Sequence, residues 1–219
     1  MIKIKVGIAS LVEREEQLIK TIDSLINQVD EIHVCLNNYL EPPYEHEKVT
    51  FFYSDNVFGD YGKFLGLKGF DGYYFTADDD IIYPPTYIQD TIPHIDMYGV
   101  VSYHGRTFTK YPIMSYHRTP AIRNRCLQEY LYTEPVDIAG TGVMGMRTDI
   151  FKPPFDIFKE RNMADIFVSC YAKEQGIRIW GLKHSADYFT YQHVPNTIYD
   201  SRVDNCEYET RLVNKHFNK

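Results

Sequence analysis

The order of apolar segments in the first 80 residues constrains the fold more than any other feature of this sequence. Residues 2–9 alternate apolar side chains with lysine or glycine, which predicts a strand. From residue 18 to residue 29 apolar side chains recur at helical spacing, which predicts a helix with one buried face. Three more apolar runs predict strands over 32–36, 49–53 and 73–77. Strands that alternate with helices predict an α/β fold, in which a mostly parallel central sheet is flanked by helices.

The remaining elements are predicted from caps and periodicity. Ser10 and Glu13 form an S-x-x-E capping box, so the first helix is expected to begin at Ser10. The second half of the chain is less regular, and residues 104–125 show no clear period. Further helices are expected over 62–70 and 163–175, and further strands over 100–103 and 177–182.

Length and charge limit the classes of function. At 219 residues the chain is long enough for one α/β domain and short for two. A formal net charge of −7 argues against binding to nucleic-acid backbones, and an acidic protein that binds a phosphorylated ligand needs a cation or local basic residues. Four separated cysteines without a C-x-x-C pair are typical of reduced thiols in an intracellular protein.

The N-terminal segment and the hydropathy of the chain bear on its location. The alternating pattern at the start of the chain is that of a strand rather than of a signal peptide. No apolar run approaches the ~20 residues that span a bilayer. We therefore expect a soluble, cytoplasmic protein without a membrane span.

Polar residues follow each predicted strand of the first half. The strand ends carry Ala9 and Ser10, then Asn37, then Asp55, and finally the run 78–80 of three aspartates. In open parallel sheets ligands bind at the carboxyl ends of the strands. These positions are therefore expected to line one crevice.

The three consecutive aspartates are costly unless a cation neutralises them, because their mutual repulsion raises their pKa values. In an extended segment alternate side chains share a face, so Asp78 and Asp80 are expected to point together and Asp79 away. Two such carboxylates can hold a hard divalent ion and leave positions open for phosphate oxygens and water. The alternative is a solvated acidic turn that caps the following helix.

The aspartates belong to a longer segment, residues 74–88 (YFTADDDIIYPPTYI), and five more segments accompany it in order. Together they resemble the GT-A glycosyltransferases, most closely the bacterial and viral family-2-like members, across residues 1–185. The segment 74–88 resembles the D-x-D motif of that family together with its following helix. The other matching segments are 4–10 (IKVGIAS), 18–28 (LIKTIDSLINQ), 55–63 (DNVFGDYGK), 140–142 (GTG) and 163–166 (MADI).

The resemblance implies a single GT-A domain over 1–219, with a nucleotide-binding half over 1–100 and an acceptor-binding half over 101–219. It implies a sugar transfer from a nucleotide-sugar, taken as a UDP-sugar, to a saccharide or glycan hydroxyl with the help of Mn²⁺ or Mg²⁺. The Q-x-x-R-W motif of processive synthases is missing, so non-processive transfer is expected. Whether the chain is one module of a larger glycosyltransferase, and whether configuration is inverted or retained, stay open.

The resemblance also implies roles for individual residues. Asp165 stands where the family often has its catalytic base, although Ala164 replaces the acidic residue that usually precedes it; the alternative is an aspartate favoured by a helix N-terminus. A late histidine is expected as a further metal ligand, with His193 preferred to His184. The metal ligands implied are Asp78, Asp80 and His193, and the nucleotide contacts implied are Ala9, Ser10, Asn37, Asp55, Lys63, Asp78 and Asp79.

Two other classes of function remain as alternatives. A sugar-phosphate nucleotidyltransferase has a similar fold, but its glycine-rich basic loop should follow the first strand, where this chain has residues 9–13 (ASLVE). A non-catalytic carbohydrate-binding domain would explain the 19 tyrosines, yet it gives no reason for three aspartates at a strand end. A dinucleotide oxidoreductase lacks its G-x-G-x-x-G motif here, and a phosphohydrolase would need more acidic or histidine ligands at earlier strand ends.

Overall fold

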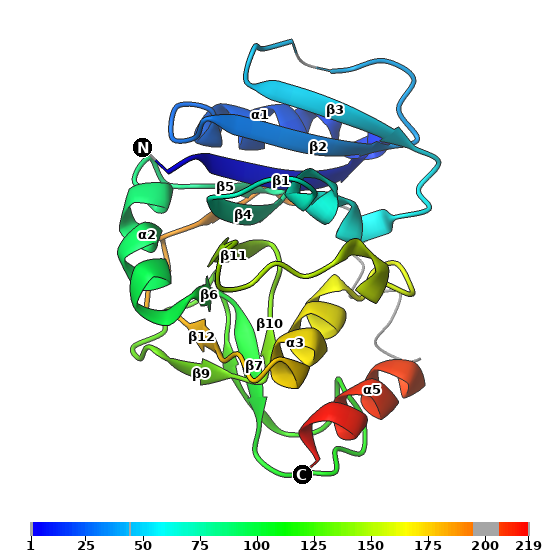
Figure 1. The fold of residues 1–219 in the computed structure, drawn as a ribbon, viewed down its shortest axis with the longest axis vertical. Helices are drawn as coiled ribbons and strands as arrows, with labels where there is room; N and C mark the ends of the chain where they lie inside the picture. The colour runs from blue at the N-terminus through cyan, green and yellow to red at the C-terminus, as the bar shows by residue number, and fades with distance from the viewer. Residues whose placement is uncertain (1, 44, 195–205, 219) are drawn as a thin grey trace.

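The computed structural model describes residues 2–43, 45–194 and 206–218, and a large sheet forms its centre (Figure 1). In the described part this sheet has eight strands in the order β3-β2-β1-β4-β11-β6-β12-β9. The first four lie parallel to one another, β11 runs antiparallel to both β4 and β6, and β12 is again parallel to β6. The expected mostly parallel α/β sheet is confirmed. Its strands are β1 Ile4–Leu11, β2 Glu31–Asn37, β3 Val49–Ser54, β4 Tyr73–Asp78, β6 Val100–Ser102, β9 Glu134–Val136, β11 Val143–Arg147 and β12 Ile179–Gly181.

Helices and two small sheets surround the large sheet. The first small sheet contains β10, β7 and β8. The second contains β13 and β5, and β5 directly follows the three aspartates in the sequence. The helices are α1 Glu15–Leu25, α2 Tyr87–Tyr98, α3 Ala164–Glu174 and α5 Glu207–Phe217, with 3-10 turns η1 Val12–Arg14, η2 Gly59–Leu67 and η3 Phe155–Ile157. The small-sheet strands are β5 Ile81–Ile82, β7 Gly105–Phe108, β8 Ala121–Asn124, β10 Ile138–Ala139 and β13 Thr190–Tyr191. None of the helices among the described residues is both long and apolar enough to cross a membrane.

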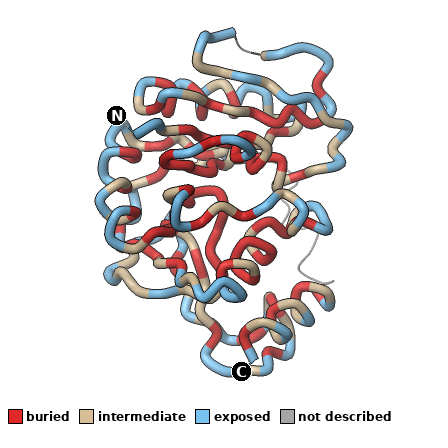
Figure 2. The backbone as a smooth tube through the Cα atoms, in the orientation of Figure 1, coloured by how far each residue is buried: buried red, intermediate tan, exposed pale blue. Residues whose placement is uncertain are grey.

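The sheet separates two apolar layers, as Figure 2 shows by the buried strands between more exposed surroundings. Neighbouring residues of β4 face opposite layers: Phe75 joins the cluster beneath α1 and α2, and Tyr74 joins the cluster beneath η2, α3 and α5. This three-layer arrangement leaves only the ends of the strands open to a ligand. The site must therefore lie where the strands end, and not on a face of the sheet.

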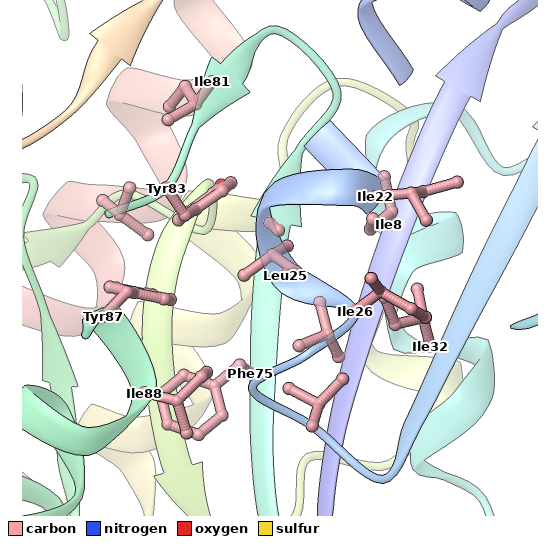
Figure 3. Packing of buried hydrophobic residues seen from close by; sticks show 14 of the residues in the cluster. Ile8, Ile22, Leu25, Ile26, Ile32, Phe75, Ile81, Tyr83, Tyr87 and Ile88 are labelled. Carbon is pink, nitrogen blue, oxygen red and sulfur yellow. The ribbon is translucent and has the colours of Figure 1, made fainter. Parts of the chain in front are cut away.

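Helix α1 shows why the spacing of apolar residues in the sequence predicted a helix. Leu18, Ile22 and Leu25 follow at helical spacing and are fully buried. Figure 3 shows Ile22 and Leu25 packed near Ile8 of β1 and Ile32 of β2. The spacing places one apolar stripe on the sheet, and burial of that stripe holds the helix against β1 and β2.

Truncating one residue of this stripe should be strongly destabilising. We expect Leu18→Ala to lower the free energy of unfolding by about 2–5 kcal/mol, because it removes buried methyl groups and leaves a cavity. Leu40→Ala is the matched control: Leu40 is 96% exposed, and its loss should cost under ~0.5 kcal/mol. Urea unfolding of both variants measures the difference, and similar values for the two would contradict this packing.

The predicted start of the first helix is wrong. Ser10 lies within β1, where it pairs with Leu36, and α1 begins at Glu15 without a side-chain cap. The strand continues past the predicted cap because Leu11 also finds a partner, Asn37, on β2. Ladder hydrogen bonds over the full length of β2 outweigh one local capping bond.

The second half holds the elements that the sequence did not predict. The aperiodic stretch 104–125 contains β7 and β8, which pair with each other, and β10 pairs with β7. The helix over 163–175 is confirmed as α3, with Phe167 and Cys170 buried as expected. Helix α5 was missed, and it packs beside α3.

Candidate active site

A cavity of about 340 Å³ opens at the carboxyl end of β4, between the two halves of the chain. The acidic end of β4 and the N-terminal turn of α3 both contribute to its wall, together with η2, the segment 140–143 and helix α5. Its charged or titratable lining residues are Asp60, Lys63, Asp78, His104, Arg106, Tyr116, His117, Cys126, Asp165 and Glu209.

Two basic side chains form ion pairs with the three aspartates. Lys63 of η2 forms an ion pair with Oδ1 of Asp78. Arg14 lies 3.1 Å from Oδ1 of Asp79 and 3.4 Å from Oδ2 of Asp80, in each case through Nη1. The expected strand alternation does not extend through the cluster, because β4 ends at Asp78 and the next two residues form a turn. Asp79 nevertheless points inward, with 4% of its surface exposed.

Burial and mutual repulsion act on the pKa values of these carboxyl groups. Burial is the main cause that raises the pKa of Asp80 to about 7, and the charges of Asp78 and Asp79 add to it. Burial also raises the pKa of Asp79, although Arg14 opposes this shift. Carboxylates under such repulsion are stabilised when a further cation arrives.

The aspartates offer the oxygen ligands that a divalent ion prefers, but they supply only some of the ligands that such an ion needs. Within the described ranges, no three or more His, Cys, Asp or Glu side chains are grouped as they would be around a metal. Asp78 and Asp80 supply two oxygen ligands of the kind that Mg²⁺ and Mn²⁺ accept, and the side chain of Asp78 is 44% exposed toward the cavity. A hexacoordinate ion would take its other ligands from phosphate oxygens and water.

The two histidines considered as metal ligands lie in different settings. His184 is buried, and its ring nitrogens lie 2.9 Å from the carbonyl oxygen of Leu182 and 3.2 Å from that of Arg125. His193 is exposed and adjoins Gln192, whose backbone N–H donates to the carbonyl oxygen of Asp80. Of the two histidines, His193 is thus the one next to the aspartates with an accessible ring.

Gly142 of the segment 140–143 determines the space available to Asp78. A Cβ atom at this position would collide with the carboxylate of Asp78, whose Oδ2 lies nearest to it. Tyr83 holds the same region: its hydroxyl accepts from the backbone N–H of Asp78 at 2.9 Å and donates to the carbonyl oxygen of Gly142. The glycine therefore leaves room for the carboxylate of Asp78.

Adding a methyl group here should disturb Asp78 directly. We expect Gly142→Ala to weaken binding of a metal–nucleotide complex about tenfold or more, because the displaced carboxylate is a supporting ligand. Gly69→Ala is the control: a Cβ at Gly69 meets no atom within 4 Å, so the strain of its positive φ of 72° lowers stability without displacing Asp78. Calorimetry with UDP and Mn²⁺ compares the two variants, and equal affinities would contradict this placement.

On the opposite wall, Asp165 is oriented by its neighbour Thr141. The backbone N–H and the hydroxyl of Thr141 both donate to Oδ1 of Asp165, at 2.7 Å and 2.6 Å. Oδ2 of Asp165 accepts no hydrogen bond from the residues that the structure describes. One oxygen is thus held in place, and the other is available to accept a proton in the cavity.

Asp60 anchors the helix that carries Asp165. Its two carboxylate oxygens accept the backbone N–H groups of Asn162 at 2.5 Å and Ala164 at 2.9 Å, at the start of α3. These bonds satisfy N–H groups that the first turn of a helix leaves unpaired. Burial raises the pKa of Asp60 to about 6. Because both oxygens of Asp60 are occupied, Asp165 is the better placed of the two as a proton acceptor.

The predicted nucleotide contacts from the first three strands do not line this cavity among the described residues. Asn37 is buried and donates to the carbonyl oxygen of Gly59 at 3.5 Å. Ser10 is buried against the hydroxyl of Tyr39, at 3.2 Å. Ala9 is partly exposed beside Asp78, with which it pairs, and Asp55 is exposed beyond β3. Lys63, Asp78 and Asp165 are the predicted residues that the fold brings together.

Sequence reasoning missed several residues that line the cavity. His104 is fixed through its backbone: Ser102 Oγ donates to its carbonyl oxygen at 2.9 Å, and Gly140 leaves the space that its ring occupies. Arg106 lies over the ring of Tyr116, 4.2 Å from the ring centroid. Glu209 comes from α5, where Val213 and Phe217 follow it at helical spacing on the buried face. That spacing was the available signal for α5, whereas no local pattern marks the residues in 104–125.

Comparisons with known proteins agree with this geometry at the level of the fold. No family model matches the sequence, and no curated protein matches it either. The structure of Staphylococcus aureus TarS 1–349 is similar, with a TM-score of 0.55 and 15% identity over 99% of this chain and 71% of that one. The same fragment in complex with UDP-GlcNAc has a TM-score of 0.54 and 14% identity over 91% of this chain.

The chain spans only part of these proteins: 61% of the TarS fragment bound to UDP-GlcNAc and 43% of the longer TarS structure. A 4-diphosphocytidyl-2C-methyl-D-erythritol synthase from Anaerococcus prevotii is also similar, with a TM-score of 0.54 and 10% identity over 100% of this chain and 99% of that one. Identities this low establish architecture and leave the reaction open. The sheet order, the aspartates at the end of β4 and these similarities together show that the chain has the GT-A-like fold of nucleotide-sugar transferases.

Proposed function

We propose that this protein is a metal-dependent, non-processive glycosyltransferase that moves a sugar from a nucleotide-sugar to a hydroxyl of a saccharide or glycan. One observation carries the proposal: Asp78, at the end of β4, and Asp165, at the start of α3, open into the same cavity. This pairs a carboxylate suited to a diphosphate-bound cation with a carboxylate suited to accept a proton.

The donor would bind in the half over residues 1–100. Asp78 and Asp80 would hold Mn²⁺ or Mg²⁺, with His193 as a candidate third ligand, and the metal would offset the charge that develops on the leaving diphosphate. Lys63 would support the diphosphate, and Asp79 would position the ribose or the sugar. Ala9, Ser10, Asn37 and Asp55 remain the proposed contacts to the nucleoside. The TarS complex with UDP-GlcNAc supports a UDP-sugar as the donor.

The acceptor would bind against the half over residues 101–219. For an inverting transfer, the acceptor oxygen attacks the anomeric carbon, the bond from that carbon to the diphosphate oxygen breaks, and the acceptor proton passes to Oδ2 of Asp165. Thr141 orients Asp165 for this role through two hydrogen bonds. Because the chain spans part of the TarS structures, we propose that it can act as one module of a larger transferase.

A sugar-phosphate nucleotidyltransferase is the second candidate. The similarity to the erythritol synthase, which covers 99% of that chain, favours it. The turn after β1, Val12–Arg14, disfavours it, because it contains no glycine and its one basic side chain, Arg14, pairs with Asp79 and Asp80.

Calorimetric titration of UDP, with and without Mn²⁺, tests the proposal, with GDP and dTDP run in parallel. Metal-dependent binding of one nucleotide would support it, and a panel of sugars on that nucleotide would follow, scored by nucleotide release with saccharide acceptors. Release of pyrophosphate from CTP or UTP with sugar phosphates would favour the nucleotidyltransferase. Silence of all three nucleotides under every metal condition would contradict the glycosyltransferase proposal and favour a carbohydrate-binding domain.

A further inference from the structure

The carboxylate of Asp78 is already engaged in the structure. Its Oδ1 pairs with the ammonium group of Lys63, and its Oδ2 faces the α-carbon of Gly142. To share a divalent ion with Asp80, this carboxylate must release Lys63 or share one oxygen with it. A metal at this site therefore either competes with Lys63 for Oδ1 of Asp78 or displaces it.

Lys63 is an internal cation and not a surface charge. Its side chain is 3% exposed; its ammonium group pairs with Asp78, and the negative charges of Asp60 and Asp165 also act on it. Burial disfavours its charge, but Asp78 and then Asp60 hold the pKa of Lys63 above its ordinary value. The ammonium thus stays charged, and it depends on an anion at its side.

Arg14 differs from Lys63 in a way that matters here. It contacts two carboxylates, and the shorter of the two contacts, at 3.1 Å, is to Asp79. If Asp80 turned toward a metal, Arg14 would keep its partner Asp79. Lys63 makes its one ion pair among the described residues with Asp78, so a metal that takes Asp78 removes that pair.

We propose that Lys63 is the resident counter-ion of Asp78, and that it exchanges Asp78 for the diphosphate of the nucleotide when the metal binds. A metal alone would take the ion-pair partner of the buried ammonium and leave it only the charges of Asp60 and Asp165, with which it forms no ion pair; this is unfavourable. A diphosphate that arrives with the metal supplies new oxygens to Lys63 through charge-assisted hydrogen bonds. Metal and nucleotide therefore bind interdependently, and each raises the affinity of the other by the same factor. This inference rests on the proposed function, because it takes a nucleoside diphosphate as the ligand.

The test compares Lys63→Met with the wild type and with Lys68→Met, an exposed lysine just after η2. Methionine is close to lysine in length and removes only the charge. The dissociation constant of Mn²⁺ is measured from the electron paramagnetic resonance signal of the free ion, first with Mn²⁺ alone and then with saturating UDP. Thermal melting of each variant verifies that it is folded.

In the wild type and in Lys68→Met, we expect UDP to raise Mn²⁺ affinity about tenfold or more, a typical coupling between two sites. In Lys63→Met, Mn²⁺ alone should bind about tenfold more tightly than in the wild type, and UDP should add little to that affinity. The two ligands thus respond in opposite directions: loss of the ammonium strengthens binding of the metal and weakens binding of the nucleotide.

An unchanged or lower affinity for Mn²⁺ alone in folded Lys63→Met would overturn the inference, whatever UDP does. A persistent effect of UDP on Mn²⁺ in that variant would overturn it as well. If UDP, GDP and dTDP all fail to bind the wild type at any Mn²⁺ concentration, the proposed function fails instead. The comparison with Mn²⁺ alone still shows in that case whether Lys63 competes with a cation for Asp78.

Discussion

Asp80→Ala is expected to abolish metal-dependent binding of UDP, lowering its affinity in the presence of Mn²⁺ by about 100-fold or more, or ~2.7 kcal/mol. Asp80 is half-buried beside Asp78 and Asp79, and its loss removes one of the two carboxylates proposed to hold the ion. Without the ion, a −3 diphosphate would face a cluster of carboxylates. Calorimetry with UDP and Mn²⁺ measures the loss.

The control is Asp71→Ala, because the side chain of Asp71 is 90% exposed. Its affinity for UDP should match that of the wild type. UDP binding that survives both Asp80→Ala and removal of metal with EDTA would exclude the role proposed for the aspartates.

Binding should also depend on pH in a defined direction. Metal ligands must be deprotonated, and burial together with two neighbouring carboxylates raises the pKa of Asp80 to about 7. The ionised form binds the metal, so the affinity for Mn²⁺ with UDP rises as pH increases through 7 and levels off above it. Below pH 7 it falls by up to about tenfold per pH unit. Mn²⁺ titrations of the wild type with UDP between pH 6 and pH 8 measure this dependence, and an affinity that does not change with pH would contradict it.

The second large effect is expected from Asp165→Asn, which should lower the rate of sugar transfer by about 10²–10⁴. The asparagine oxygen keeps both hydrogen bonds from Thr141, so the fold and the orientation of the side chain are retained. An amide nitrogen then replaces Oδ2, and this nitrogen cannot accept the proton of the acceptor hydroxyl. Nucleotide release from UDP-sugars in the presence of saccharide acceptors measures the rate.

Donor binding separates a chemical role from a structural one. Asp165→Asn should bind UDP and Mn²⁺ as the wild type does, since Asp165 lies on the acceptor wall. Asp187→Asn, on the exposed surface, should retain the full rate of transfer. If Asp165→Asn transferred sugar at the rate of the wild type, a base at this position would be unnecessary, as in a retaining mechanism.

The first half of the chain was predictable because its contacts are regular. Its central strands β1, β2 and β4 are mostly buried, so apolar residues mark them, and α1 buries one stripe against the sheet, so its apolar residues recur at helical spacing. The position of Asp78 follows from the same regularity, since a polar residue that ends a buried strand must lie at the edge of the sheet.

The second half was less predictable because its elements are short and depend on distant partners. Residues 104–125 form strands because β10 and β8 pair with β7, and no local period records that pairing. Pairing with β2 likewise extends β1 through Ser10, where a local capping motif predicted a helix. Tertiary pairing overrode local preference in both segments.

Sequence reasoning predicted the α/β layers, the end of the sheet where the acidic residues gather, and the residue types available there. Local periodicity and composition contain that information because burial of apolar faces sets the spacing of side chains. The sequence pattern could not predict that Lys63 pairs with Asp78, that Arg14 joins Asp79 to Asp80, or that Asp60 anchors the helix of Asp165. These contacts join residues from separate elements, and their geometry depends on how the sheet, η2 and α3 pack together.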